Sequence, residues 1–130
     1  MLARVDAFID RNLADPELTP AAIAAHHHIS LRALHELFRG RERTVAATIR
    51  HRRLERCRAD LTQPRLAHVP LHAIAMRHGF TSAAAFSRAF RASFAVTAQE
   101  VRHERALRPA PPVGAAGDES VRSLRSGAAP

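Results

Sequence analysis

Polar and basic side chains form two short stripes at helical spacing. Each stripe occupies positions i, i+3, i+4 and i+7, and the two stripes are 52 residues apart. The first consists of Arg32, His35, Glu36 and Arg39, and the second of Ala84, Ser87, Arg88 and Arg91. Side chains at this spacing project from one face of a helix, so each stripe can meet a single partner. Guanidinium, imidazole, carboxylate and hydroxyl groups bond to base edges and phosphates, which makes a nucleic acid a candidate partner.

The stripes lie in two half-repeated segments, residues 23–38 (IAAHHHISLRALHELF) and residues 74–90 (IAMRHGFTSAAAFSRAF). Each segment begins with Ile-Ala, breaks, and restarts at a serine that can cap the next helix, Ser30 or Ser82. Two short helix–turn–helix units in one basic chain predict a protein that places two helices in one DNA duplex. We expect Ser30 and Ser82 to contact phosphate, since they stand where the second helix of each unit begins.

The charge of the chain indicates attraction to a polyanion. Of 130 residues, 20 are arginine, none is lysine and 12 are acidic, so the formal net charge is +8. Arginine suits bidentate contacts to phosphate and guanine, although GC-rich coding sequence would also favour it. From Arg39 to Arg58 there are eight arginines and only two glutamates. Phosphate contact, weakening as salt rises, is one interpretation of this cluster, and a solvated helix face is the other.

No pattern in the chain indicates catalysis. It has no Ser-His-Asp arrangement, paired carboxylates or glycine-rich phosphate loop, so we expect neither an enzyme nor a cofactor. The single cysteine, Cys57, excludes an intramolecular disulfide and a cysteine-rich zinc site, and its apolar helix stripe predicts a buried thiol. Residues 26–28 are consecutive histidines, which cannot all face one ion on regular structure. We interpret them as turn and surface residues, with metal binding as the alternative.

Membrane insertion and secretion are not expected. The apolar runs are much shorter than the about 20 residues that a membrane-spanning helix needs. Charged residues interrupt the apolar stretch that a signal peptide would have near the N-terminus. The expected location is the cytoplasm, in association with the nucleoid.

Helix signals predict an all-α fold of seven helices. Apolar residues at helical spacing run from Leu2 to Leu13 and stop before Asp15-Pro16. The other helices are expected over residues 20–26, 31–39, 44–61, 71–78, 83–94 and 97–105. A loop is expected over residues 64–70. Residues 106–130, rich in Pro, Gly, Ala and Ser, are expected to form a disordered tail.

Apolar residues predict how these helices pack. The buried stripes after Ser30 and Ser82 are expected to be Leu31, Leu34, Leu37 and Phe38, and Phe86, Ala89, Phe90 and Phe94. The long helix has apolar residues at Val45, Ile49, Leu54, Cys57 and Leu61. The step from Ile49 to Leu54 is one residue out of phase, so the apolar stripe changes face midway. Such a helix is suited to pack against one unit at its start and another at its end.

These segments resemble the DNA-binding domain of the AraC/XylS family of bacterial transcription regulators. The most specific part is residues 71–94, LHAIAMRHGFTSAAAFSRAFRASF, which matches the family signature IHAIAxxxGFxSxxxFSRAFxxxF. Residues 18–40 are similar to the family's first helix–turn–helix, and residues 49–61 to its connecting helix. The resemblance implies one domain, residues 1–105. Within it, helix–turn–helix subdomains at residues 1–43 and 63–105 are joined by a rigid helix at residues 44–62.

The resemblance also implies how DNA is bound. The second helix of each unit enters the major groove, in two grooves about 34 Å apart on one face of the duplex. By position, the base-reading residues of the family match Arg32, His35, Glu36, Ala83, Ala84, Ser87 and Arg88. The predicted phosphate contacts are Ser30, Arg39, Arg50, Arg53, Ser82 and Arg91. Arg88 is the leading candidate, and Glu36 either accepts from a cytosine amino group or pairs with Arg32 or Arg39.

A few positions depart from the family pattern. His28 stands in the first turn where glycine is usual, which predicts backbone strain. Ala95, Ala98 and Val101 replace the usual glycine, proline and aromatic residue, which leaves the geometry of the last helix open. Family members usually carry an effector or dimerisation domain before this one, whereas here Met1 begins at the DNA-binding domain. A stand-alone member and a fragment that lacks its effector domain are both consistent with the sequence.

The sequence is therefore consistent with two functions. The first is a sequence-specific regulator of transcription, an activator by family habit, that binds double-stranded promoter or operator DNA across two adjacent major grooves. The alternative is an interaction module that acts on RNA polymerase or another regulator, with little DNA specificity of its own. The adjacent alanines of the second helix, Ala83 and Ala84, are poor in hydrogen-bonding groups and motivate the alternative. Enrichment of a two-part DNA motif distinguishes the two.

Overall fold

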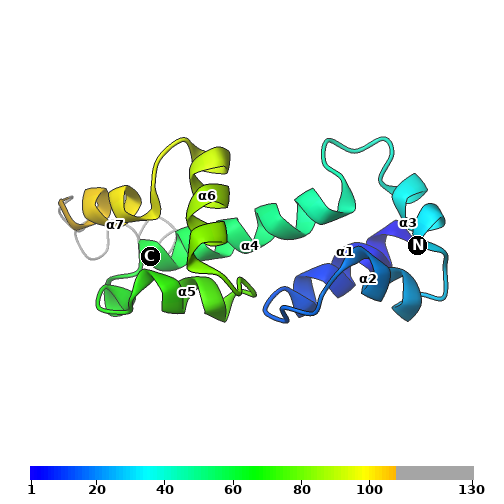
Figure 1. Ribbon diagram of the computed structural model, residues 1–130, viewed down its shortest axis with the longest axis horizontal. Helices are drawn as coiled ribbons and strands as arrows, with labels where there is room; N and C mark the ends of the chain where they lie inside the picture. Colours follow the sequence, from blue (N-terminus) through cyan, green and yellow to red (C-terminus); the bar gives the residue numbers. More distant parts are fainter. Residues whose placement is uncertain (108–130) are drawn as a thin grey trace, which may run out of the picture.

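Two lobes are joined by one long helix in the computed structural model, which describes residues 1–107 (Figure 1). The elements are α1 (Leu2–Asn12), α2 (Pro20–His26), α3 (Leu31–Leu37), α4 (Val45–Leu61), the 3₁₀-helix η1 (Pro64–Leu66), α5 (Leu71–Arg77), α6 (Ala83–Phe94) and α7 (Ala98–Leu107). We call α1–α3 the first lobe and η1 with α5–α7 the second lobe. The prediction of seven α-helices is confirmed, and no strand occurs among residues 1–107.

Side-chain caps explain where several of these helices begin. The hydroxyl oxygens of Thr19, Ser30, Thr44 and Ser82 accept hydrogen bonds from backbone N–H groups three residues later, at 2.9–3.1 Å. Each of these bonds satisfies a donor that the helix itself leaves unpaired. Three of these caps, Thr19, Ser30 and Ser82, stand at the starts that the sequence predicted.

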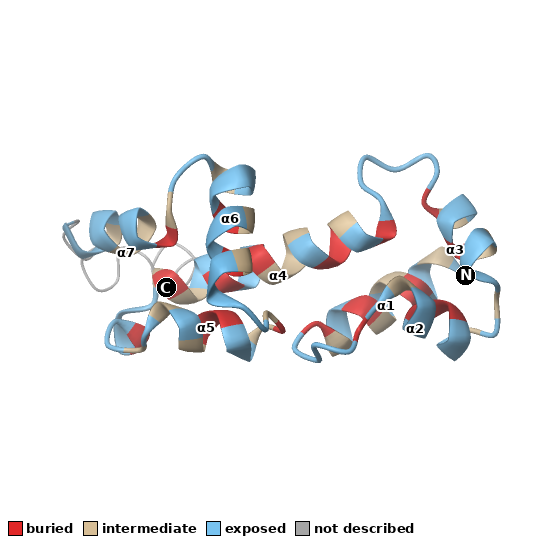
Figure 2. Cartoon of the chain, viewed as in Figure 1, coloured by how far each residue is buried: buried red, intermediate tan, exposed pale blue. Residues whose placement is uncertain are grey.

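The long helix α4 serves two separate hydrophobic cores. Val45 and Ile49 join the core of the first lobe, whereas Leu54, Cys57 and Leu61 join the core of the second lobe. Buried positions accordingly occur along the whole of α4 (Figure 2). The one-residue phase shift between Ile49 and Leu54 is thus confirmed as the point where α4 leaves one core and enters the other.

Within residues 1–107, two non-glycine residues adopt left-handed backbone conformations. The first is His28, with φ of 56°, in the turn between α2 and α3, where the sequence predicted strain. The other is Ala95, with φ of 63°, which ends α6 by donating its N–H to the Arg91 carbonyl at 2.8 Å. An L residue in this region carries a cost that glycine does not.

The end of the domain differs in detail from expectation. The last helix, whose geometry the sequence left open, begins with a capping box. The Thr97 hydroxyl accepts the Glu100 N–H at 3.0 Å, and the Glu100 carboxylate accepts the Thr97 N–H at 2.8 Å. The helix continues to Leu107, so residues 106 and 107, predicted to begin the tail, are helical. The remaining part of the predicted tail, residues 108–130, lies outside the described residues.

Two smaller predictions were wrong. Leu31 is 44% exposed, although it was assigned to a buried stripe. It occupies the first position of a seven-residue helix, before the part of α3 that packs against the core. The expected loop over residues 64–70 contains one turn of 3₁₀-helix, Pro64–Leu66, in which Leu66 is buried.

Candidate nucleic-acid interface

The exposed face of α3 carries three residues of the first stripe, while the fourth, Arg39, lies in the turn that follows, because α3 ends at Leu37 and not at residue 39 as predicted. The side chains of Arg32, His35, Glu36 and Arg39 are all exposed, while Leu34 and Phe38 on the opposite face are buried. In this structure Glu36 pairs with Arg39. Its carboxylate lies 2.8 Å from the Arg39 guanidinium, and both groups are largely in solvent. A pair so exposed contributes little stability and opens easily. Either partner can therefore turn to a new ligand.

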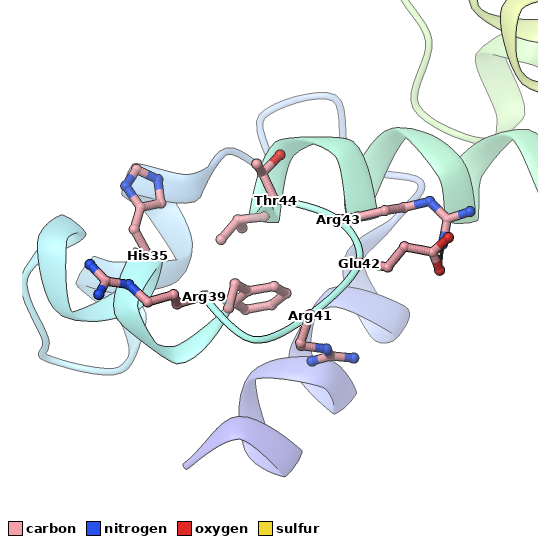
Figure 3. A pocket seen from close by; sticks show the side chains of 8 residues that line it. His35, Arg39, Arg41, Glu42, Arg43 and Thr44 are labelled. Carbon is pink, nitrogen blue, oxygen red and sulfur yellow. Dashed lines mark ion pairs between the residues drawn. The ribbon is translucent and has the colours of Figure 1, made fainter.

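A hollow of about 290 Å³ lies at the C-terminal end of this stripe, between α3 and the start of α4 (Figure 3). His35 lines it from α3 and Arg39 from the turn after α3, while Arg43 lines it from the connecting loop and Thr44 from the cap of α4. The guanidinium of Arg41 is engaged elsewhere, stacked 4.9 Å from the centre of the Phe38 ring and bonded to Asp6. The hollow thus extends the cationic surface of α3 toward α4.

The second stripe is equally uncovered on α6. Ala83, Ala84, Ser87, Arg88 and Arg91 are exposed, whereas Phe86 and Phe90 point into the second core. Within residues 1–107, neither Arg88 nor Arg32 forms a hydrogen bond or ion pair with another side chain or carbonyl. Their guanidinium groups are therefore available to a ligand.

The same turn geometry presents both helices. In the first unit the Ile29 N–H donates to the Ala24 carbonyl at 3.0 Å, and in the second unit the Phe80 N–H donates to the Ala75 carbonyl at 3.1 Å. The half-repeat seen in the sequence is thus a repeat of structure. Figure 1 shows the two presented helices apart, α3 beyond the start of α4 and α6 across its later part.

Most of the arginines on α4 are occupied within the protein. Arg52 bonds to the carboxylates of Asp6 and Asp10 at 2.9 and 3.1 Å. Arg56 donates to the Asp10 carbonyl at 3.0 Å, and Arg58 lies 4.7 Å from the centre of the Phe94 ring. Among the arginines of α4, only Arg50 is exposed and makes no such contact within residues 1–107. Sequence reasoning missed these bonds because the partners lie about 40 positions away.

Arg53 has an unusual environment for a residue predicted to contact phosphate. Its Nε donates to the Leu13 carbonyl at 2.8 Å and its Nη2 to the Asp15 carbonyl at 2.7 Å. Burial lowers the pKa of this guanidinium, and the nearby Asp15 carboxylate opposes the shift. The group remains charged at neutral pH, since arginine is protonated throughout the physiological range. Only Nη1 lies outside these two bonds.

Two histidines at the end of α2 and Cys57 make contacts inside the fold. The His26 ring stacks on Phe8 at 4.1 Å, and His27 Nδ1 lies 2.9 Å from the Ile23 carbonyl. Cys57 is fully buried, as predicted, and burial with a smaller effect from Asp60 raises the pKa of its thiol to about 12. Residues 1–107 contain no cluster of three or more histidine, cysteine or acidic side chains suited to a metal ion. None of the described helices is both long and apolar enough to cross a membrane.

These features define a class of protein, a tandem helix–turn–helix protein with one exposed helix in each lobe. A family model described as "Helix-turn-helix domain" matches residues 23–104. The chain belongs to the AraC-type helix-turn-helix family. This family consists of DNA-binding transcription regulators, which are not enzymes.

Individual relatives agree with this membership. The transcriptional activator NphR from Rhodococcus sp is 35% identical over 105 residues, which are 81% of this chain and 30% of NphR. An AraC-type transcriptional regulator structure from Chromobacterium violaceum has a TM-score of 0.71 at 28% identity, with 83% of this chain and 94% of that chain covered. A DNA-binding dual regulator from Escherichia coli K-12 has a TM-score of 0.70 at 25% identity, with 81% and 91% covered. The chain thus spans less than a third of the curated relative that it matches.

Proposed function

We propose that this chain is the DNA-binding part of a sequence-specific transcription regulator, and that it places α3 and α6 in two adjacent major grooves of double-stranded DNA. The observation that carries the proposal is the pair of exposed, polar helix faces, one in each lobe, presented by turns with the same hydrogen bonds. A helix presented in this way fits the major groove. We propose residues 1–105 as the functional domain, with its units at 1–43 and 63–105 and α4 between them.

Base contacts are assigned to the two outward faces. We assign them to Arg32, His35, Glu36, Ala83, Ala84, Ser87 and Arg88. Arg32 and Arg88 are the residues suited to bidentate bonds with guanine, and Glu36 can accept from cytosine after it leaves Arg39. The methyl groups of Ala83 and Ala84 can contact a thymine methyl, so α6 contributes fewer polar contacts than α3.

Phosphate contacts are assigned to residues beside these faces. They are Ser30, Arg39, Arg50, Arg53, Ser82 and Arg91. Arg50 lines a hollow of about 250 Å³ between the lobes, together with Thr19 and Phe80. A cation there lies between the two recognition helices, which supports contact with the phosphates between the two grooves. For Arg53, the N–H groups outside its two carbonyl bonds are those of Nη1 and the second one of Nη2.

The proposed regulatory direction is activation. NphR is named a transcriptional activator, which supports activation as the outcome of DNA binding by this chain. Because the chain corresponds to 30% of NphR, we propose that the signal for activation is received by residues outside this domain. RNA polymerase is the proposed further partner, and the cytoplasmic nucleoid the proposed location.

The test is selection of genomic DNA fragments by the purified chain, at low and at physiological salt, followed by sequencing. We expect enrichment of one asymmetric motif whose two parts lie about one helical turn apart, since the lobes present two helices. Binding that shows no motif and disappears with salt would contradict the proposal. That result, with retained binding to RNA polymerase, would instead favour the interaction module suggested by the alanines of α6.

A further inference from the structure

The turn of the second lobe touches the first lobe directly. Gly79, buried in the turn between α5 and α6, lies so close to the end of α1 that a Cβ placed on it would be 2.4 Å from the Leu13 carbonyl oxygen. The same Cβ would be 2.6 Å from Nε of Arg53. Distances this short do not occur between real atoms of these kinds, so only glycine allows the approach.

The turn by itself does not explain this approach. Gly79 has φ of 98°, which also favours glycine, whereas His28 occupies the corresponding position of the first turn with a side chain and with φ of 56°. Both residues donate their N–H three residues back, His28 to Ala25 and Gly79 to Met76, at 3.2 Å each. The turn therefore tolerates a Cβ in the first lobe. In the second lobe the space for a Cβ is filled by residues of α1 and α4.

Arg53 connects the three segments that meet at this point. Arg53 belongs to α4, and it donates hydrogen bonds to the Leu13 and Asp15 carbonyls just after α1 of the first lobe. Gly79 of the second lobe packs against its guanidinium. Each lobe has its own hydrophobic core, and α4 is the helix common to both. The contact around Arg53 is thus a second connection between the lobes, beside the continuous backbone of α4.

We propose that Arg53, packed against Gly79, is a positioning residue that sets the orientation of α3 relative to α6, and thereby the separation of the two half-sites that the chain accepts. A change of one base pair moves a half-site by about 3.4 Å and rotates it by about 35°. A chain whose lobes are held at two places cannot follow that change without strain. This proposal rests on the proposed function for its consequence in DNA binding, but its structural part is independent.

The first experiment measures the structural part without DNA. Spin labels are attached to Ala7→Cys in the first lobe and Met76→Cys in the second, both exposed positions, while the buried Cys57 thiol stays unlabelled. We expect one narrow distance distribution for the labelled protein and a broader or shifted one after Arg53→Met. Methionine keeps an unbranched chain of similar length but cannot donate to the two carbonyls. Arg50→Met, one turn earlier on α4 and exposed, is the matched control and leaves the distribution unchanged.

A distribution that is identical in Arg53→Met and in the control overturns the proposal. Circular dichroism shows whether Arg53→Met is folded; should it fail to fold, Arg53→Lys keeps the charge but loses the two-carbonyl geometry and serves as the second variant. For that variant the same broadening is expected, and an unchanged distance distribution also overturns the proposal. The outcome of these measurements does not depend on whether the chain binds DNA.

The second experiment uses duplexes that carry the selected motif at its own spacing, one base pair shorter and one base pair longer. We expect about tenfold loss of affinity for the unmodified chain on either altered duplex, comparable with a mismatched base pair, and a loss of only two- to threefold for Arg53→Met. Arg50→Met keeps the discrimination and lowers the salt slope by about one unit. If Arg53→Met also keeps the discrimination between spacings, the positioning role is wrong and Arg53 acts as a phosphate contact alone. Absence of any motif contradicts the proposed function instead.

Discussion

At the scale of single residues, Arg88 has the most direct predicted effect on DNA recognition. Its guanidinium is exposed on α6 and bonds to no other residue of the described chain. Arg88→Ala is expected to weaken binding to the selected motif by about 10- to 100-fold, the value of one bidentate contact to guanine, and to weaken binding to random duplex much less. Titration of both duplexes by fluorescence anisotropy measures the difference.

Arg77→Ala provides the matched control for Arg88. Arg77 is exposed at the end of α5, off the outward face of α6, and lies 3.8 Å from the Asp60 carboxylate. This variant removes the same charge and is expected to reduce both affinities slightly and equally. Equal losses on motif and random duplex for Arg88→Ala would show that Arg88 contacts phosphate and not a base.

Ala95 offers a prediction about stability at the same scale. It ends α6 with φ of 63°, where glycine would avoid the clash of Cβ with the backbone. Ala95→Gly is expected to raise the free energy of unfolding by about 0.5–1 kcal/mol, measured by urea denaturation. Ala92→Gly, inside the same helix, is expected to lower it by about 1 kcal/mol. A loss of stability in both variants would contradict the strain assigned to Ala95.

At the scale of elements, local signals were sufficient to predict the helices and their order. Thr19, Ser30 and Ser82 predicted where helices begin because a hydroxyl cap acts on an N–H only three residues away. Thr44 was expected as the first residue of its helix and is its cap instead. The phase shift in α4 predicted two cores because it is also a property of neighbouring residues. The exposed stripes of α3 and α6 followed from the same periodicity.

The contacts between elements could not be predicted in this way. The arginines of α4 were predicted either to meet phosphate or to face solvent, yet Arg52, Arg53 and Arg56 bond to carboxylates and carbonyls near α1. Their partners are 38–46 residues away. A guanidinium can bond to any acceptor that tertiary structure brings near, and helical periodicity does not specify which one. For the same reason the approach of Gly79 to Leu13 was invisible in the sequence.

Asp6 of α1 binds two arginines, Arg52 of α4 and Arg41 of the loop before it, and this yields a prediction. Its carboxylate accepts from Arg52 at 2.9 Å and from Arg41 at 3.1 and 3.2 Å. Burial acts to raise the pKa of Asp6, but the bonds and charges of Arg41 and Arg52 outweigh it and lower the pKa below its usual value. A lowered pKa contributes stability that is present above the unfolded value of about 4 and is lost as pH falls through the folded value.

Asp6→Asn should therefore be less stable than the unmodified chain at pH 7, by about 1–2 kcal/mol, because the amide leaves Arg41 without a carboxylate and Arg52 with that of Asp10 alone. The difference should shrink as the pH falls below about 4 and the wild-type carboxylate becomes protonated. Urea denaturation at pH 7 and at low pH measures both values. Glu42→Gln is the control, since Glu42 is largely exposed and its ion pair with Arg43 is long at 3.7 Å, so a change under about 0.5 kcal/mol is expected. A pH-independent loss for Asp6→Asn would exclude the charge as its cause.

At the scale of the whole molecule, the two lobes share the helix that completes both cores. The first lobe contributes only short helices, α1–α3, and its core needs Val45 and Ile49 of α4. The second core needs Leu54, Cys57 and Leu61 of the same helix. A unit of about 40 residues does not bury enough surface to be stable alone. Each lobe should thus depend on the other through α4 and through the contact of Arg53 with Gly79.

This dependence predicts cooperative unfolding. Ile9→Ala, at a fully buried position of the first core, is expected to cost about 2–5 kcal/mol. When the first lobe opens, the first half of α4 loses its core, and a short isolated helix is not stable in water. The amides of α5 and α6 should therefore lose hydrogen-exchange protection by the same free energy as those of α2. Ile74→Ala, fully buried in the second core, should give the reciprocal result. Protection in α6 that persists while α2 exchanges freely would mean that the lobes unfold separately, and that only the backbone of α4 joins the two helices proposed to read DNA.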